Sequence, residues 1–213
     1  MSESNANVVR GKKTKITALL FDLGGVVMDI DFNQAFITWV GMSDCDAAAL
    51  ASRFSFDVGY QRHELGELTG EQYFQGLMST LGMTIHYQQF IEGWSAIFNG
   101  VSPEITNILS LMAPRYPIYA LSNTNHLHHL GWANKYADTL QYFERLFLSY
   151  EMGMRKPERR VFDHVAQQMG VSHQQVLFFD DTIENVDVAR ELGMTAVHVR
   201  SVADVENAIA QFC

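Results

Sequence analysis

The feature of this sequence that most constrains its fold is a series of short apolar runs, most of which end abruptly in polar residues. Five such runs can be recognised, at residues 16–21, 118–121, 146–148, 176–179 and 196–199. Their length and composition are typical of strands buried on both faces. Helical patterns separate the later runs, for example at 158–169 and 184–192, and Gly170 and Gly193 follow them where helix C-caps belong. This alternation predicts a parallel α/β sheet with right-handed crossovers and flanking helices.

One long interval breaks the alternation. Between about residue 32 and about residue 100 the chain has helical patterning punctuated by glycines, and no convincing strand is evident in it. Within this interval, residues 69–72 (TGEQ) have the form of a capping box before an apolar stretch. We therefore expect a Rossmann-like α/β core of residues 1–31 and 101–213, with a small all-α cap of residues 32–100 inserted after the first strand.

Composition and charge exclude several classes of protein. The chain is 47% hydrophobic and 18% charged, which is the balance of a folded globular protein, and its formal net charge of −9 argues against a general nucleic-acid binder. No apolar run approaches the roughly 20 residues of a membrane helix. Residues 1–15 lack the apolar segment of a signal peptide, and the two cysteines, Cys45 and Cys213, lie in neither a metal-binding nor a redox context. We expect a cytoplasmic protein that binds neither nucleic acid nor membrane, and the sequence does not reveal its oligomeric state.

Polar residues gather at the ends of the predicted strands, where ligands bind in sheets of this kind. Asp22 follows the first run and precedes two glycines, which let the backbone turn closely around a ligand. Asp180 and Asp181 follow the fourth run. Carboxylates gathered in this way form a hard oxygen site, of the kind that Mg²⁺ prefers.

The second run and a later loop add groups of the opposite character. Ser122 and Asn123 supply a hydroxyl, an amide and backbone N–H groups at a predicted helix start, which suits an anion. Lys156 adds a positive charge in a loop that Pro157 and the following helix would hold in place. A carboxylate nucleophile, a metal, neutral donors and an ammonium together are what phosphoryl transfer requires.

Four segments resemble, in order, the four motifs of the haloacid dehalogenase superfamily. They are residues 21–27 (FDLGGVV), 121–125 (LSNTN), 155–158 (RKPE) and 178–181 (FFDD). The resemblance extends over residues 16–199 and includes a helical cap after the first motif. Within the superfamily, the sequence is similar to the subgroup of the bacterial α-D-glucose-1-phosphate phosphatase. That likeness is carried by residues 21–33, 63–64, 66–67, 121–125 and 153–158.

This resemblance implies roles for individual residues. Asp22 would form an aspartyl-phosphate, Ser122 and Asn123 would hold the transferred phosphoryl group, and Lys156 would stabilise Asp22 and the phosphate. The implied substrate is a small phosphorylated metabolite, and the subgroup favours a sugar phosphate.

The resemblance also implies a Mg²⁺ cofactor. Its ligands would be Asp22, the backbone carbonyl of Gly24 and Asp181, while Asp180 would act directly or through water.

The sequence departs from the family pattern at Gly24. Most phosphatases of the superfamily carry a second aspartate there, which protonates the leaving oxygen and later activates water. Glycine can do neither, and such acid–base help is typically worth about 10²–10⁴-fold in rate. A cap residue or a water could substitute, and Asp31 and His63 are candidates by residue type. Alternatively, an anomeric sugar oxygen would need less help to leave.

Other functions are weighed against the phosphatase. In 2-haloacid dehalogenation the aspartate attacks carbon and no metal is needed, so Gly24 permits it, but the acidic pair at 180–181 is then unexplained. A phosphomutase would need the missing acid–base residue even more. A catalytically impaired binding protein of the same fold would bind Mg²⁺ or phosphate without turnover.

Three histidines follow the second motif, at positions 126, 128 and 129. His126 and His129 would share a helical face, as zinc ligands often do. No third ligand of suitable type and spacing accompanies them, so a role on the surface or at the rim of the active site is the preferred interpretation.

Overall fold

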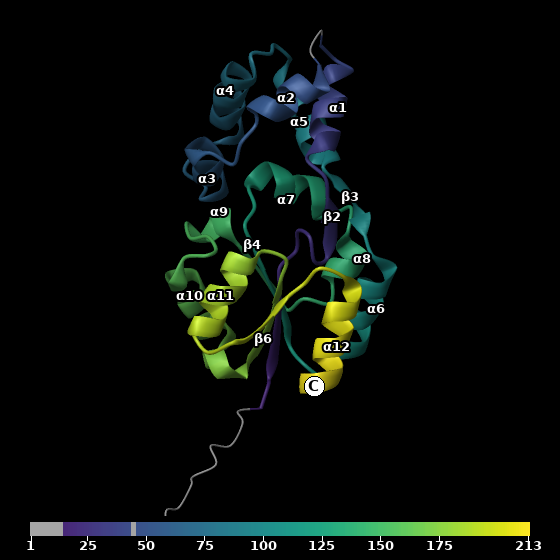
Figure 1. Ribbon diagram of the computed structural model, residues 1–213, viewed down its shortest axis with the longest axis vertical. Coiled ribbons are helices and arrows are strands. Elements are labelled where there is room, and N and C mark those ends of the chain that lie inside the picture. The colour runs from purple at the N-terminus through teal and green to yellow at the C-terminus, as the bar shows by residue number, and fades with distance from the viewer. Residues whose placement is uncertain (1–14, 44–45) are drawn as a thin grey trace, which may run out of the picture.

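The computed structural model describes residues 15–43 and 46–213; Cys45 and the N-terminal segment discussed above, up to residue 14, lie outside that part. Its centre is a parallel sheet in the order β5-β4-β1-β6-β7 (Figure 1). The strands are β1 (Ala18–Phe21), β4 (Ile118–Ser122), β5 (Arg145–Leu148), β6 (Val176–Asp180) and β7 (Thr195–His198). Each predicted apolar run therefore contains a strand, and the predicted fold class is confirmed.

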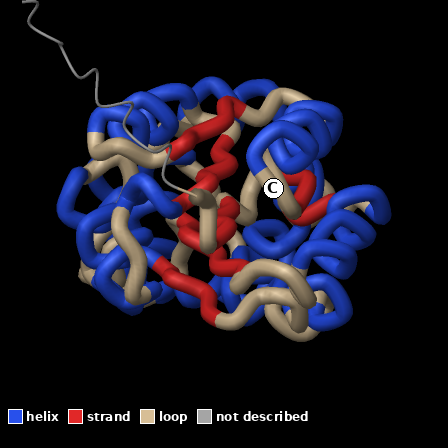
Figure 2. Tube along the Cα trace, turned by 90° about the horizontal axis from the view of Figure 1, so that it is seen from below, coloured by secondary structure: helices blue, strands red, loops and turns tan. Residues whose placement is uncertain are grey.

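Helices cover both faces of the sheet (Figure 2). The four that do so are α6 (Pro103–Met112), α10 (Arg159–Met169), α11 (Ile183–Glu191) and α12 (Val202–Phe212). The side chains of β1 alternate between the two faces: Leu19 and Phe21 join the cluster that contains α6 and α12, whereas Ala18 and Leu20 join the cluster of α10 and α11. Because every position of β1 is apolar, the strand is stable only with helices on both sides.

Shorter elements complete the core. They are α7 (His126–Trp132), α8 (Ala137–Leu140), α9 (Ser149–Met152) and the 3₁₀-helix η1 (His173–Gln175). Helices α10 and α11 match the predicted 158–169 and 184–192 to within one residue at each end. None of the helices described combines the length and the apolar character that crossing a bilayer would require.

Five helices from the long insert lie beyond the carboxyl ends of the strands (Figure 1). We call them the cap helices: α1 (Asn33–Val40), α2 (Ala47–Arg53), α3 (Val58–Glu64), α4 (Gly70–Leu81) and α5 (Tyr87–Ala96). The predicted capping box is confirmed, since the Thr69 and Gln72 side chains each accept a hydrogen bond from the other's backbone N–H at the start of α4. Aromatic side chains fill the space between these helices. Trp39 stacks on Trp94 with centroids 6.2 Å apart and donates its indole N–H to the Phe90 carbonyl at 3.2 Å.

The expectation of no strand between residues 32 and 100 is wrong at its far end. Strand β3 (Phe98–Val101) pairs antiparallel with β2 (Met28–Ile30), and this ribbon leads the chain into and out of the cap helices. Strand β3 was not recognised in the sequence because it contains Asn99 and Gly100, both poor strand formers. Its partner also lies about 70 residues away, where local patterns carry no information.

A glycine in α5 provides a test of the aromatic interior. A methyl group on Gly93 would lie 2.2 Å from the Trp39 indole nitrogen, in a ring that Phe90 and Trp94 hold in place. We expect Gly93→Ala to lower the free energy of unfolding by about 1–3 kcal/mol, because overpacking outweighs the gain in helix propensity. Gly76→Ala, at an exposed position of α4 with nothing within 4 Å, is the matched control and should raise the free energy of unfolding by about 0.5–1 kcal/mol. Urea unfolding measures both; equal stability of Gly93→Ala and wild type would contradict this packing.

Candidate active site

The sheet brings the predicted acidic residues together. Asp22 follows β1, and Asp180 and Asp181 lie at the end of the adjacent β6. The backbone N–H of Asp22 donates to the Phe179 carbonyl at 2.8 Å, which continues the pairing of the two strands. One carboxylate oxygen from each of the three aspartates lies within 4.8 Å of the others. The convergence expected from the strand ends is therefore observed.

Lys156 lies buried between two of these carboxylates. Its Nζ is 2.9 Å from Oδ2 of Asp22 and 2.6 Å from Oδ2 of Asp180, and its side chain is 1% exposed. The backbone around it is held by Asn123, whose Oδ1 accepts from the Lys156 N–H at 2.8 Å and whose Nδ2 donates to the Lys156 carbonyl at 2.9 Å. The Asn123 side chain thus positions the lysine loop, a contact that sequence reasoning did not anticipate.

Asp180 is fixed from several sides and fully buried. Its Oδ1 accepts from the Thr182 N–H at 2.8 Å, and Nδ2 of Asn185 lies 2.9 and 3.1 Å from its two oxygens. Asn185 was missed in the sequence, although its place in the first turn of α11 turns it back toward the end of β6. Thr182 occupies the N-cap position of α11, but its hydroxyl donates to Asp181 at 3.3 Å instead of capping the helix.

The charges in this site favour a divalent cation. Three carboxyl groups, of Asp22, Asp180 and Asp181, face one ammonium, that of Lys156, so full ionisation would place two uncompensated negative charges in a largely buried space. Burial raises the pKa of Asp22 above its ordinary value; Lys156 opposes this effect and Asp180 adds to it. A cation beside the three carboxylates would restore the ionised form of Asp22.

The backbone also leaves room for one of these carboxylates. Gly25 has φ +76°, and a methyl group there would lie 2.1 Å from Oδ2 of Asp181. Only glycine allows this carboxylate to approach the turn after β1. The residues present therefore fit a hard, oxygen-coordinated metal such as Mg²⁺.

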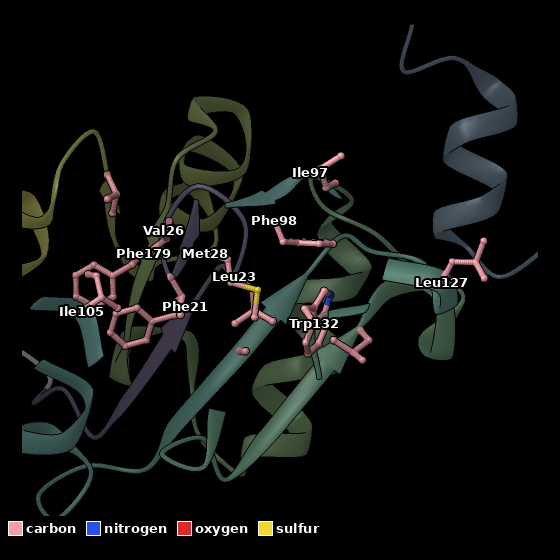
Figure 3. Packing of buried hydrophobic residues seen from close by; sticks show 14 of the residues in the cluster. Phe21, Leu23, Val26, Met28, Ile97, Phe98, Ile105, Leu127, Trp132 and Phe179 are labelled. Atoms are coloured by element: carbon pink, nitrogen blue, oxygen red, sulfur yellow. The ribbon is translucent and has the colours of Figure 1, made fainter. Parts of the chain in front are cut away.

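A cavity of about 310 Å³ opens above these residues. Its floor contains Asp22, Ser122, Asn123 and Asp181, and its walls come from the ribbon, the cap helices and α7. The remaining wall is mainly apolar and aromatic, and consists of Leu23, Met28, Ile30, Phe32, Tyr60, Ile97, Phe98, His128 and Trp132. Figure 3 shows Leu23, Met28, Phe98 and Trp132 gathered at this end of the sheet.

Neither proposed substitute for the missing acid lies at this cavity. Asp31 instead lies two residues before α1, where its carboxylate accepts from the Gln34 amide at 3.1 Å and from the Asn33 N–H at 2.9 Å; these hydrogen bonds lower its pKa. His63 is buried and stacks on Tyr73 with centroids 4.4 Å apart. At position 24, a methyl group on the glycine would lie 2.7 Å from Cδ1 of Ile30, so that side chain occupies the space of an acidic one.

The three histidines have separate environments. His126 is exposed, His129 contacts the Tyr150 hydroxyl at 2.6 Å, and His128 is buried in the cavity wall. Nδ1 of His128 accepts from the Asn125 amide at 3.0 Å, which places the ring proton on Nε2. Among the described residues, Asp22, Asp180 and Asp181 form the one cluster suited to a metal, so no zinc site is formed by the histidines there.

Comparison with known proteins identifies the family. Residues 16–193 match the model of the haloacid dehalogenase-like hydrolases. The chain belongs to this family. The family resemblance seen in the four motifs is thereby confirmed, as is the expectation that the chain is a hydrolase.

Two curated phosphatases are similar to this chain over most of their length. A D-ribitol-5-phosphate phosphatase of Bacteroides thetaiotaomicron is 27% identical over 195 residues, which covers 89% of this chain and 94% of that protein. A sesquiterpene phosphatase of Aspergillus oryzae is 25% identical and covers 87% and 91%.

Solved structures agree with this assignment. A haloacid dehalogenase family enzyme of Bacteroides thetaiotaomicron in complex with magnesium has a TM-score of 0.80 at 27% identity, over 92% of this chain and 99% of that one. The same enzyme in complex with magnesium and inorganic phosphate has a TM-score of 0.74 at 28% identity, over 85% and 92%. A dehalogenase with a TM-score of 0.64 is only 16% identical, over 87% and 85%, and shares the fold.

The buried histidines make the stability of the protein sensitive to acid. Burial lowers the pKa of His128 to about 3 and that of His63 to about 4, and neighbouring imidazoles act in the same direction. Below pH of about 6.5 the unfolded chain binds protons at these residues whereas the folded chain does not. The free energy of unfolding should therefore fall as the pH falls from 6.5 to 4, by up to about 3 kcal/mol for each residue.

Urea unfolding between pH 7 and pH 4.5 measures this loss. We expect His63→Gln to show a shallower pH dependence than the wild type, while His86→Gln, which replaces an exposed histidine just before α5, serves as control. If the free energy of unfolding fell equally steeply with pH in His63→Gln and in the wild type, the buried neutral imidazole of His63 would be ruled out as a source of the acid sensitivity.

Proposed function

We propose that this hydrolase is a Mg²⁺-dependent phosphatase that hydrolyses a small phosphorylated metabolite through an aspartyl-phosphate on Asp22. The observation that carries the proposal is the buried Asp22 carboxylate, paired with Lys156 and facing a cavity together with Asp181. The phosphatases among its relatives and the magnesium and phosphate complexes of a structural neighbour support it.

The proposed reaction has two steps. A carboxylate oxygen of Asp22 attacks phosphorus, the bond from phosphorus to the ester oxygen breaks, and the alcohol leaves with a proton from solvent or a nearby group. Water then attacks the aspartyl-phosphate, which releases inorganic phosphate and regenerates the carboxylate. Asp22 is oriented for the first step by two contacts: the Leu23 N–H donates to Oδ1 at 2.7 Å, and Lys156 lies 2.9 Å from Oδ2.

The remaining site residues receive the roles that the family resemblance implies. At the end of β4, the Ser122 hydroxyl and the backbone N–H of Asn123 would hold the transferred group, since the Asn123 side chain is bound to the Lys156 backbone, and Lys156 would neutralise charge on the group. Mg²⁺ would be held by Asp22, the Gly24 carbonyl and Asp181, with Asp180 acting directly or through water. When bound, the ion would supply the positive charge that two anions, Asp22 and the phosphate, need in order to approach one another.

The substrate class remains part of the proposal. A sugar phosphate is favoured by the likeness to the glucose-1-phosphate phosphatase subgroup and by the D-ribitol-5-phosphate phosphatase among the relatives. We further propose that residues 32–100 act as a cap over a core of residues 1–31 and 101–213. The cap would select the alcohol, because residues of this segment contribute to the cavity wall.

The alternatives explain less of the site. A 2-haloacid dehalogenase would tolerate Gly24, and dehalogenases share the fold. Dehalogenation needs no metal, however, and leaves the cluster of three carboxylates without a purpose. A catalytically impaired binding protein would not need to retain the nucleophile, the lysine and the acidic pair together.

The phosphatase proposal is tested by phosphate release from p-nitrophenyl phosphate and a panel of sugar phosphates. We expect turnover with Mg²⁺, loss of turnover with EDTA, and at least about a 10³-fold lower rate for Asp22→Asn, since the nucleophile is removed. Asp29→Asn, which alters an exposed carboxylate on β2, is the matched control. No turnover of any phosphate ester by the wild type would overturn the proposal and make haloacids the next substrates.

Gly24 predicts an unusual dependence on the leaving group. Without an acid at this position, kcat/KM for phenyl phosphate should exceed that for cyclohexyl phosphate, a substrate of similar size, by about 10²-fold or more. The double variant Gly24→Asp with Ile30→Ala makes room for a carboxylate and should narrow this ratio. Equal rates on the two substrates in the wild type would show that an acid elsewhere in the cavity protonates the alcohol.

A further inference from the structure

A buried ion pair joins the cap helices to the loop of Lys156. Glu64 is the last residue of α3, and its Oε2 accepts from Nη2 of Arg155 at 2.8 Å and from Nε at 3.1 Å. The side chains are 4% and 22% exposed. Burial of this kind is unusual for a glutamate and indicates that the partner and its geometry matter.

The backbone beside Glu64 is attached to the core as well. The Ser149 hydroxyl lies between two carbonyls, 2.7 Å from that of Glu64 and 2.8 Å from that of Thr124, and it accepts from the Thr124 N–H at 2.9 Å. Thr124 follows the Ser122–Asn123 segment directly. The end of α3 is therefore linked through one hydroxyl to the loop that would bind phosphate.

Gly66 brings the two parts into direct contact. Its φ is +73°, and a methyl group there would lie 2.4 Å from the Tyr150 carbonyl in α9. Helices α3 and α9 lie next to each other in Figure 1. The segment from Glu64 to Gly66 thus contacts the core through a side chain, a carbonyl and a close backbone approach.

Both ends of the ion pair lead to the cavity. One turn before Glu64 on α3, Tyr60 forms part of the cavity wall, and burial, together with the nearby Glu64 carboxylate, raises the pKa of its hydroxyl. On the other side, Arg155 precedes Lys156, whose Nζ contacts Asp22 and Asp180. Movement of α3 away from the core would shift the cavity wall and release one of the supports of the lysine loop.

We propose that Glu64 is a positioning residue, whose pairing with Arg155 holds α3 closed on the core and thereby fixes Tyr60 and the Lys156 loop around the substrate. This inference rests on the proposed phosphatase function for its kinetic consequences, but the closed arrangement itself does not depend on it. The exposed pair of Arg62 and Glu67, at 3.0 Å with side chains 50% and 51% exposed, gives a control in the same segment. Exposed pairs of this kind contribute little.

Kinetics on p-nitrophenyl phosphate with Mg²⁺ test the proposal in Glu64→Gln, Arg155→Lys, the double variant and Glu67→Gln. Glu64→Gln keeps the shape of the side chain, and Arg155→Lys keeps the charge, so both variants should fold. Misplacement of reacting groups by about 1 Å can cost about 10²-fold, and we expect a loss of that order in kcat/KM for each single variant, at temperatures well below unfolding. The loss of kcat/KM in the double variant should be no greater than in the less active of the two single variants, because both changes break the same contact. Glu67→Gln should stay within about twofold of wild type.

Hydrogen exchange provides a second readout that needs no activity. Faster exchange at residues 58–66 and at 153–158 is expected in Glu64→Gln, and not in Glu67→Gln. If the wild type turns over no phosphate ester, the proposed function fails. The exchange result still tests whether the pair of Glu64 and Arg155 holds α3 closed on the core. The proposal would be overturned if Glu64→Gln had the same kcat/KM and the same exchange rates as the wild type, even if its melting temperature fell. It would also be overturned if the losses of kcat/KM in the two single variants added up in the double variant.

Discussion

The structure depends on how a group of charges is kept at the centre of the sheet. Lys156 is almost wholly buried and contacts both Asp22 and Asp180. Ions taken out of water are costly unless every one is paired and hydrogen-bonded. The fold meets this requirement with groups from four segments: the strand ends of β1 and β6, the Asn123 amide and the first turn of α11. A chain that lost Asp22 or Asp180 would leave the buried ammonium with one partner fewer, and a chain that lost Asn123 would release the backbone that carries it.

The same arrangement explains why the cavity lies where it does. Parallel strands direct their carboxyl ends to one edge of the sheet, where side chains from sequence positions 22, 122 and 181 become neighbours. Helices α6, α10, α11 and α12 use the two faces and leave this edge free. The ribbon and the cap helices then cover it with Ile30, Phe32 and Tyr60. Charged groups below and a mainly apolar wall above give the cavity two chemically different ends.

Much of the core fold and of the acidic cluster could be predicted from the sequence, because these features depend on patterns of a few neighbouring residues. Apolar runs, glycines at helix ends and the capping box at Thr69 all act over a few residues, and strand ends must converge once the sheet is parallel. The contacts that were missed join distant segments. Asn123 with Lys156 spans 33 residues, Glu64 with Arg155 spans 91, and the ribbon of β2 and β3 unites the two ends of the insert. Asp31 and His63 were considered by residue type, and it is their direction in the fold that keeps them from the cavity.

Gly24 separates two contributions to catalysis at such a site, proton transfer and electrostatic stabilisation. With Ile30 in the place of an acidic side chain, the turn after β1 supplies no proton, and its glycines instead let Asp181 approach closely. In the proposed reaction, stabilisation of the transferred group would then rest on fixed positive charge: Lys156 from within the fold and a cation held among the three aspartates. Positioned charge is commonly a large contribution to catalysis in phosphoryl transfer, because negative charge is spread over the oxygens of the transferred group. A site that keeps its charges and gives up its acid can therefore remain an enzyme, provided that the alcohol it releases is a good leaving group or is protonated by water in the cavity.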